Sequence, residues 1–172
     1  MAYRNKTFVS FASEDIHCYR LMTAWKANEN IDFNFYDAHG FYTALDTSQP
    51  ETIRRRIRER LANTKQVILL VGDKTRAKAA DANSFIYYEM YVIKQLDLPI
   101  VIVNLNKSRM AESARIPAQI LDVYTISVSF QPTIIKYALD SFPATFASNL
   151  AAAAPVSGPH QYNGSVYKSL GL

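Results

Sequence analysis

Strand-like and helix-like segments alternate along most of this 172-residue chain, and the run Gln66–Val71 constrains the fold most. Every residue of this run after Gln66 is apolar, and Gly72 follows it at once. A short, continuous apolar run is typical of a strand that is buried on both faces of a parallel sheet. Because parallel strands need crossover connections, we predict an α/β domain with helices on both faces of the sheet.

The spacing of apolar residues indicates the other elements of this domain. Further strands are expected over residues 7–11, 32–36, 99–103 and 122–126, and helices over residues 13–25, 48–61, 83–96 and 132–142. After Phe146 the chain is rich in alanine, proline, serine and glycine. We therefore predict one domain over residues 1–146 and a C-terminal tail over residues 147–172, which is partly flexible or docked on a partner.

The composition excludes several kinds of chemistry. Only two of the five glycines, Gly40 and Gly72, precede residue 158, so the glycine-rich loops that cradle phosphates are absent. One cysteine and three scattered histidines give no metal-ligand spacing, and a single cysteine forms no internal disulfide. No apolar run approaches the ~20 residues of a membrane span, and no secretory signal precedes the first strand. We expect a cytoplasmic protein without a metal site or membrane partner.

The net charge of +4 is concentrated in one helix. Five arginines of residues 54–60 occupy several faces of that helix, and Glu51 and Glu59 interrupt them. This pattern favours a solvated helix surface over a nucleic-acid interface. A phospho-acceptor domain of the response-regulator type is disfavoured, because the loop after the first strand lacks the acidic pair of its metal site.

The helix over residues 83–96 carries an unusually placed carboxylate. Glu89 shares one helix face with Phe85 and Ile86 before it and with Val92 and Ile93 after it, so it lies on or beside the buried stripe. Burying a carboxylate without a partner is costly. Two interpretations remain open from the spacing: a functional carboxylate, or an edge glutamate that reaches solvent or pairs with an arginine.

Polar loops follow the predicted strands at the edge where open parallel sheets bind ligands. These loops are Phe11–Ser13, Asp37–Gly40, Gly72–Thr75 and Asn104–Asn106. The chain from Gly72 leads into the helix of Glu89, whose first turn faces the same edge. The hydroxyl, carboxylate, imidazole and ammonium groups of these loops suit a ligand of nucleotide size.

Three segments resemble conserved boxes of Toll/interleukin-1 receptor (TIR) domains. Residues 6–15 resemble the first box, a strand followed by a polar Ser-x-Asp turn, and residues 67–75 resemble the third strand and its loop. The Phe85-x-x-x-Glu89 spacing resembles the helix that carries the catalytic glutamate of NAD-cleaving members, although tryptophan is common where Phe85 stands. The similarity covers about residues 6–126 in order. It is closest to the bacterial TIR-like proteins of the Thoeris anti-phage system.

The resemblance implies the TIR fold, a flavodoxin-like three-layer sandwich with a five-stranded parallel sheet. It implies an enzyme that cleaves NAD with Glu89 as its catalytic carboxylate, NAD being a substrate and not a cofactor. The nucleotide released, a cyclic ADP-ribose isomer or an ADP-ribose conjugate, would signal to an anti-phage effector. Candidate substrate-binding residues are Phe11, Ser13, Asp37, His39, Lys74, Thr75 and Phe85.

A lone carboxylate suits this chemistry. Ordinary glycosidases need two carboxyl groups because their neutral leaving group must be protonated. Nicotinamide in NAD is already a cation and departs neutral, so one anion that stabilises the ribosyl centre is sufficient. The alternative is a non-enzymatic TIR interaction module that associates through residues 37–48 and its surface helices. The product, the oligomeric state and the activating trigger stay open.

Overall fold

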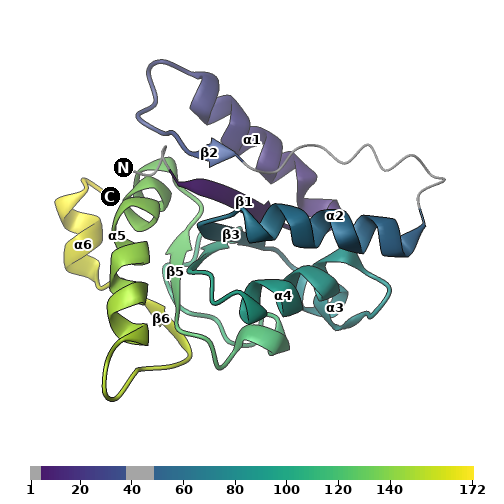
Figure 1. Cartoon of the computed structure of the whole chain (residues 1–172). Helices are drawn as coiled ribbons and strands as arrows, with labels where there is room; N and C mark the ends of the chain where they lie inside the picture. Colours follow the sequence, from purple (N-terminus) through teal and green to yellow (C-terminus); the bar gives the residue numbers. More distant parts are fainter. Residues whose placement is uncertain (1–4, 38–48) are drawn as a thin grey trace.

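A six-stranded parallel sheet forms the centre of the protein in a computed structural model, which describes residues 5–37 and 49–172 (Figure 1). The strands lie in the order β2-β1-β3-β4-β5-β6. They are β1 (Lys6–Ser10), β2 (Tyr36–Asp37), β3 (Gln66–Val71), β4 (Ile100–Asn104), β5 (Thr125–Ser129) and β6 (Pro159–Gln161). All neighbouring strands pair in parallel, which confirms the predicted fold class.

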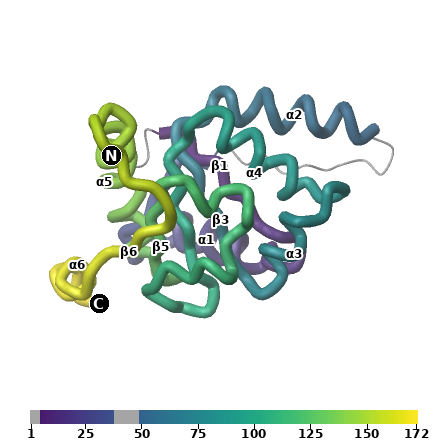
Figure 2. Tube along the Cα trace, turned by 90° about the horizontal axis from the view of Figure 1, so that it is seen from below, coloured from purple at the N-terminus to yellow at the C-terminus, as the bar shows by residue number. Residues whose placement is uncertain are grey.

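Helices connect the strands and cover both faces of the sheet. They are α1 (Ile16–Ala27), α2 (Pro50–Ala62), α3 (Thr75–Ala80), α4 (Phe85–Gln95), α5 (Pro132–Leu150) and α6 (Gly164–Ser169), with short 3-10 turns η2 (Ser13–Asp15) and η3 (Ala118–Ile120). Helix α2 runs beside α4 in both views, whereas α6 lies at the other end of the molecule (Figures 1 and 2). Within the described residues, no helix is both long and apolar enough to cross a membrane.

Side chains that alternate along the strands divide the core into two layers. Phe8 of β1 packs in the layer under α2, α3 and α4, whereas its neighbour Val9 packs in the layer under α1, α5 and α6. Strand β3 is buried over its full length and contributes to both layers, as its continuous apolar run predicts. Burial on both faces therefore fixes the orientation of each strand residue, including the polar Ser10.

The strand order reverses direction at β1, whose two neighbours are β2 on one side and β3 on the other. The connections that leave β1 and β3 consequently diverge to opposite faces of the sheet. In open α/β sheets this reversal opens a crevice beyond the carboxyl ends of the two strands, and ligands bind there. Strand β1 ends at Ser10, which pairs with Leu69 of β3.

The strands β1 and β4 lie within one residue of the sequence prediction, whereas larger differences occur at three places. The segment expected as a strand over residues 32–36 pairs only at its end, because Phe33 and Phe35 pack into the core while their backbone stays outside the sheet. Strand β5 begins at Thr125, three residues later than expected. The sixth strand was not predicted, because three residues that begin with Pro159 are too few to show an alternating pattern.

The C-terminal segment that contains β6 and α6 completes the far edge of the sheet. Strand β6 pairs with β5, and Asn163 caps α6 by accepting hydrogen bonds from two backbone N–H groups. The side chain of Tyr167 is fully buried in the layer under α5, and its hydroxyl oxygen accepts a hydrogen bond of 3.1 Å from the backbone N–H of Ser129. The guanidinium of Arg109 lies 4.3 Å from the centre of the Tyr167 ring.

This anchoring predicts that Tyr167→Ala destabilises the protein. Removing a fully buried aromatic ring leaves a cavity and should lower the free energy of unfolding by about 3–5 kcal/mol. Urea unfolding followed by circular dichroism measures the loss, and Lys168→Ala at an exposed neighbouring position is the control. Equal stability of the two variants would contradict a folded C-terminal segment.

Candidate functional site

Helix α4 begins at the carboxyl edge of the sheet, where Ser84 caps it. The Ser84 side chain accepts a hydrogen bond of 3.2 Å from the backbone N–H of Tyr87 and donates one to the carbonyl of Lys78, which joins the start of α4 to α3. The next residue, Phe85, is 49% exposed. Glu89 lies one turn further along the same helix face, so Phe85 lies between Glu89 and the carboxyl edge of the sheet.

The Glu89 side chain is buried at the end of β1. Only 7% of the residue is exposed, and its neighbours on α4, Ile86 and Met90, belong to the core. The hydroxyl of Ser10 donates a hydrogen bond of 2.5 Å to Glu89 Oε2. No salt bridge involves Glu89 among residues 5–37 and 49–172. The hydrogen bond therefore places at the end of β1 a carboxyl group that has no counter-ion within the described part of the chain.

Burial controls the ionisation of this group. Removal of the carboxyl group from water raises the pKa of Glu89 from 4.5 to about 7, and the hydrogen bond from Ser10 opposes that rise. Both the charged and the neutral forms are therefore populated near neutral pH. Carboxyl groups with a strongly shifted pKa cluster at functional sites, so Glu89 is a candidate site residue.

Three side chains link α1 to the strand ends. The ring of Phe11, just after β1, stacks on Tyr19 with ring centres 5.1 Å apart. The hydroxyl of Tyr19 donates a hydrogen bond of 2.6 Å to Asp37 Oδ2. Asp37 pairs in register with Thr7, so it lies three residues, or about 10 Å along the strand, before Ser10. Phe11 and Asp37 are two of the predicted site residues. Tyr19, which contacts both of them, was not predicted.

Three of the other predicted substrate-binding residues lie in the loops after β1 and β3, where two are exposed and one is buried. Ser13 is exposed and donates a hydrogen bond of 3.1 Å to Glu14, and Lys74 is exposed at the start of α3. Thr75 is fully buried, and its hydroxyl oxygen accepts a hydrogen bond of 2.9 Å from the backbone N–H of Gly72. That contact shapes the loop after β3. His39 lies outside the described residues.

A close contact between the loops after β1 and β3 closes one side of the crevice. A Cβ atom on residue 72 would lie 2.6 Å from Oδ1 of Asp15, so a larger residue there would require the Asp15 carboxyl group to move. Asp15 Oδ2 is buried without a hydrogen-bond partner among the described residues, and burial raises the pKa of this carboxyl group. The Ser-x-Asp turn in the sequence indicated a polar loop but not this contact.

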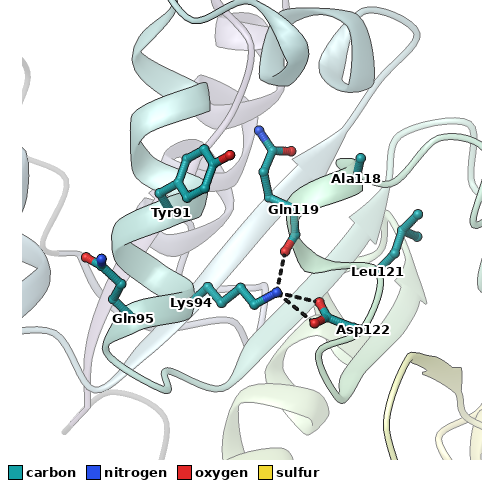
Figure 3. A pocket seen from close by; sticks show the side chains of 7 residues that line it. All are labelled: Tyr91, Lys94, Gln95, Ala118, Gln119, Leu121 and Asp122. Carbon is teal, nitrogen blue, oxygen red and sulfur yellow. Dashed lines mark hydrogen bonds and ion pairs between the residues drawn. The ribbon is translucent and has the colours of Figure 1, made fainter.

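Two open cavities among the described residues lie away from Glu89. One, of about 530 Å³, is lined by the last turns of α4 and by η3; there Lys94 Nζ contacts both carboxyl oxygens of Asp122 and the carbonyl of Gln119 (Figure 3). The other, of about 330 Å³, includes Lys6 and Asp37. The end of α4 and the start of β1 both lie at the amino edge of the sheet, so neither cavity replaces the crevice as the candidate site.

A comparison with protein families confirms the predicted resemblance. The family model described as Thoeris protein ThsB, TIR-like domain, matches residues 8–110, which is more than half of the chain. The matched segment includes β1, α4 and the Ser10–Glu89 contact. No curated protein matches the chain. Among the described residues, no group of three or more histidine, cysteine, aspartate and glutamate side chains could hold a metal ion.

The buried carboxyl group predicts a pH-dependent gain of stability in Glu89→Gln. The folded state of the wild type binds an extra proton between the ordinary pKa of 4.5 and the raised value of about 7. Wild-type stability therefore falls as pH rises through this window, whereas a neutral glutamine is unaffected. Above pH 7 the variant should be more stable by up to about 3 kcal/mol, and below pH 4.5 the two should be alike.

Urea unfolding of both proteins at a series of pH values measures this difference. Glu29→Gln, at an exposed position, is the control and should show no such trend. A difference between wild type and Glu89→Gln that stays constant from pH 4 to pH 8 would contradict a raised pKa for Glu89.

Proposed function

We propose that this chain, which belongs to the Thoeris ThsB family of TIR-like domains, cleaves the bond between nicotinamide and ribose in NAD. Family membership makes it a TIR-like module of anti-phage defence. The proposal adds that the module is an enzyme, with Glu89 as its catalytic carboxylate. Its product would be an ADP-ribose-derived nucleotide, a cyclic isomer or a conjugate, that signals to an effector.

One observation supports this proposal above the others: the buried carboxyl group of Glu89 has Ser10 as its hydrogen-bond donor and no cation beside it among the described residues. A buried carboxylate without a counter-ion is costly, so the missing cation is expected from the ligand. The nicotinamide ring of NAD carries a positive charge next to its ribose. Binding of that charge near Glu89 would lower the pKa of the carboxyl group and favour the anion.

The reaction then needs little else from the protein. As the bond between ribose C1′ and the nicotinamide nitrogen breaks, its electron pair goes to the ring nitrogen and the ring leaves as a neutral molecule. Positive charge develops on C1′ and the ribose ring oxygen, and the Glu89 carboxylate stabilises it. Because the leaving group takes no proton, no general acid is required.

The aromatic side chains near the crevice provide stacking surfaces. Phe85 presents an exposed ring one helical turn from Glu89, and Phe11 is half-buried just after β1. We assign Phe85 to the nicotinamide ring and Phe11 to the rim of the ribose site. The exposed Ser13 and Lys74 can reach ribose hydroxyls or phosphates, whereas the Thr75 hydroxyl already serves the loop itself.

The acceptor of the ribosyl group decides the product. Water would give ADP-ribose, so an enzyme that makes a signal has to keep water from the cation. An internal hydroxyl or ring nitrogen of the nucleotide would give a cyclic isomer, and an external acceptor would give a conjugate. Self-association of TIR domains would complete the enclosure, and a diffusible product would reach the effector without direct contact.

Glu89→Gln should abolish nicotinamide release while the protein stays folded. A neutral amide keeps the size of the side chain but does not stabilise the developing cation, so activity should fall by roughly a hundred- to a thousandfold, as for other removed electrostatic groups. Incubation with NAD followed by mass spectrometry detects nicotinamide and identifies the second product. A series of protein concentrations allows for activation by self-association.

Glu29→Gln is the matched control, because it makes the same substitution at an exposed position and should retain full activity. Turnover by Glu89→Gln would remove Glu89 from the mechanism. Failure of the wild type to release nicotinamide at any concentration would instead support the alternative, a TIR interaction module without enzymatic activity.

Phe85→Ala should weaken substrate binding without unfolding the protein. The loss of one stacking contact is worth about 0.5–1.5 kcal/mol and should raise KM by roughly two- to twelvefold with a smaller effect on kcat. Steady-state kinetics of nicotinamide release measure both constants. Tyr91→Ala removes an equally exposed ring near the other end of α4 and should leave KM unchanged. Equal effects of the two variants would contradict a contact between Phe85 and the substrate.

A further inference from the structure

Ser10 is a polar residue on a strand face that otherwise packs against an apolar layer. It shares a strand face with Phe8, which packs in the layer under α2, α3 and α4. Only 1% of Ser10 is exposed. An alanine or valine would fit the pattern of that face, and a buried hydroxyl without a partner would be unfavourable. The partner is Glu89 Oε2, 2.5 Å away.

The hydrogen bond engages one carboxyl oxygen and leaves the other. Ser10 donates to Oε2, and no hydrogen bond to Oε1 occurs among the described residues. Oε1 is also not among the buried side-chain oxygens that lack a partner in the described part of the chain. One oxygen is therefore anchored to the rigid central sheet, and the second is available to a ligand.

We propose that Ser10 is a positioning residue for the reaction: its hydroxyl fixes the rotamer of Glu89 and favours the charged carboxylate, with Oε1 directed to the ribosyl centre. The role of Ser10 rests on the proposed catalytic function of Glu89. The strand supplies the precision, since Ser10 pairs in register with Leu69 of the fully buried strand β3. Side chains that act on a developing charge require such supporting contacts.

The hydroxyl of Ser10 changes the pKa of Glu89 in one direction only. A hydrogen bond to the charged form of a carboxyl group lowers its pKa, and here it opposes the larger effect of burial. Among the described residues, no charged side chain contributes to the pKa of Glu89. Loss of the hydroxyl should therefore raise this pKa further and leave more Glu89 neutral near pH 7. The deficit should become smaller at higher pH, where the carboxylate forms without help.

The test is the pH profile of NAD cleavage by Ser10→Ala. Hydrogen bonds to charged groups have strengths that correspond to roughly ten- to a hundredfold in rate, so kcat/KM, which reports the ionisation of the free enzyme, should fall by that factor at pH 6.5. The ratio of wild-type to variant kcat/KM should shrink as pH rises to 9. Ser10→Thr keeps the hydroxyl and should recover most of the activity.

Ser127→Ala is the matched control. Ser127 is a fully buried serine on β5 of the same sheet, and its hydroxyl has no hydrogen-bond partner among the described residues. This variant should cause a similar or smaller loss of stability and no change in the pH profile. A general effect of removing a buried hydroxyl would appear in both alanine variants.

Titration of the Glu89 carboxyl carbon by NMR, with Glu89→Gln used for assignment, tests the contact without turnover. A higher pKa in Ser10→Ala than in the wild type supports the proposal, and an unchanged pKa overturns it. A uniform loss of kcat/KM at all pH values, not rescued by Ser10→Thr, also overturns it while the role of Glu89 stands. Absence of nicotinamide release by the wild type would refute the proposed function instead, and with it the catalytic role of Ser10.

Discussion

The hydrogen bond between Ser10 and Glu89 joins the first strand to the helix that crosses the sheet before β4, and the rest of the site is arranged around it. It places a carboxyl group in surroundings where its charge is disfavoured. The apolar layers above and below β3 provide the stability that tolerates this cost. No ion pair within the described part of the chain offsets this cost, and such departures from favourable local chemistry are expected at functional sites.

Topology explains why the contact lies at the edge of the sheet where open α/β folds usually bind ligands. Strand β1 is flanked by β2 and β3, and the chain leaves β1 and β3 towards opposite faces. Ser10 is the last residue of β1, so it lies at the carboxyl edge of the sheet, where the two connections diverge. The Asp15 carboxyl group lies close to Gly72, so the loops after β1 and β3 meet at this edge. At the far edge, β6 covers β5 and leaves the crevice untouched.

Much of the fold could be predicted from the sequence, because burial on two faces leaves a strong pattern in Gln66–Val71 and helical spacing places Glu89 on the buried stripe of α4. The position of Ser10 opposite Glu89 could not, since it depends on which strand lies beside β3 and on a separation of 79 residues. Strand β6 was missed for a related reason: three residues acquire strand character only through pairing with β5. Patterns within the chain predict elements, whereas contacts between elements require the topology.

The predicted site residues differ in the contacts that fix their positions. Phe85 and Glu89 are fixed relative to one another by one turn of a capped helix, so their relation was visible in the sequence. Thr75 was chosen for its hydroxyl, but that hydroxyl closes a turn with Gly72, as serine and threonine often do in loops. A polar residue in a loop thus has two competing uses, whereas the buried carboxyl group of Glu89 has no ion pair among the described residues that would explain its position in the core. For that reason the functional proposal depends on Glu89 and not on the number of polar groups around the crevice.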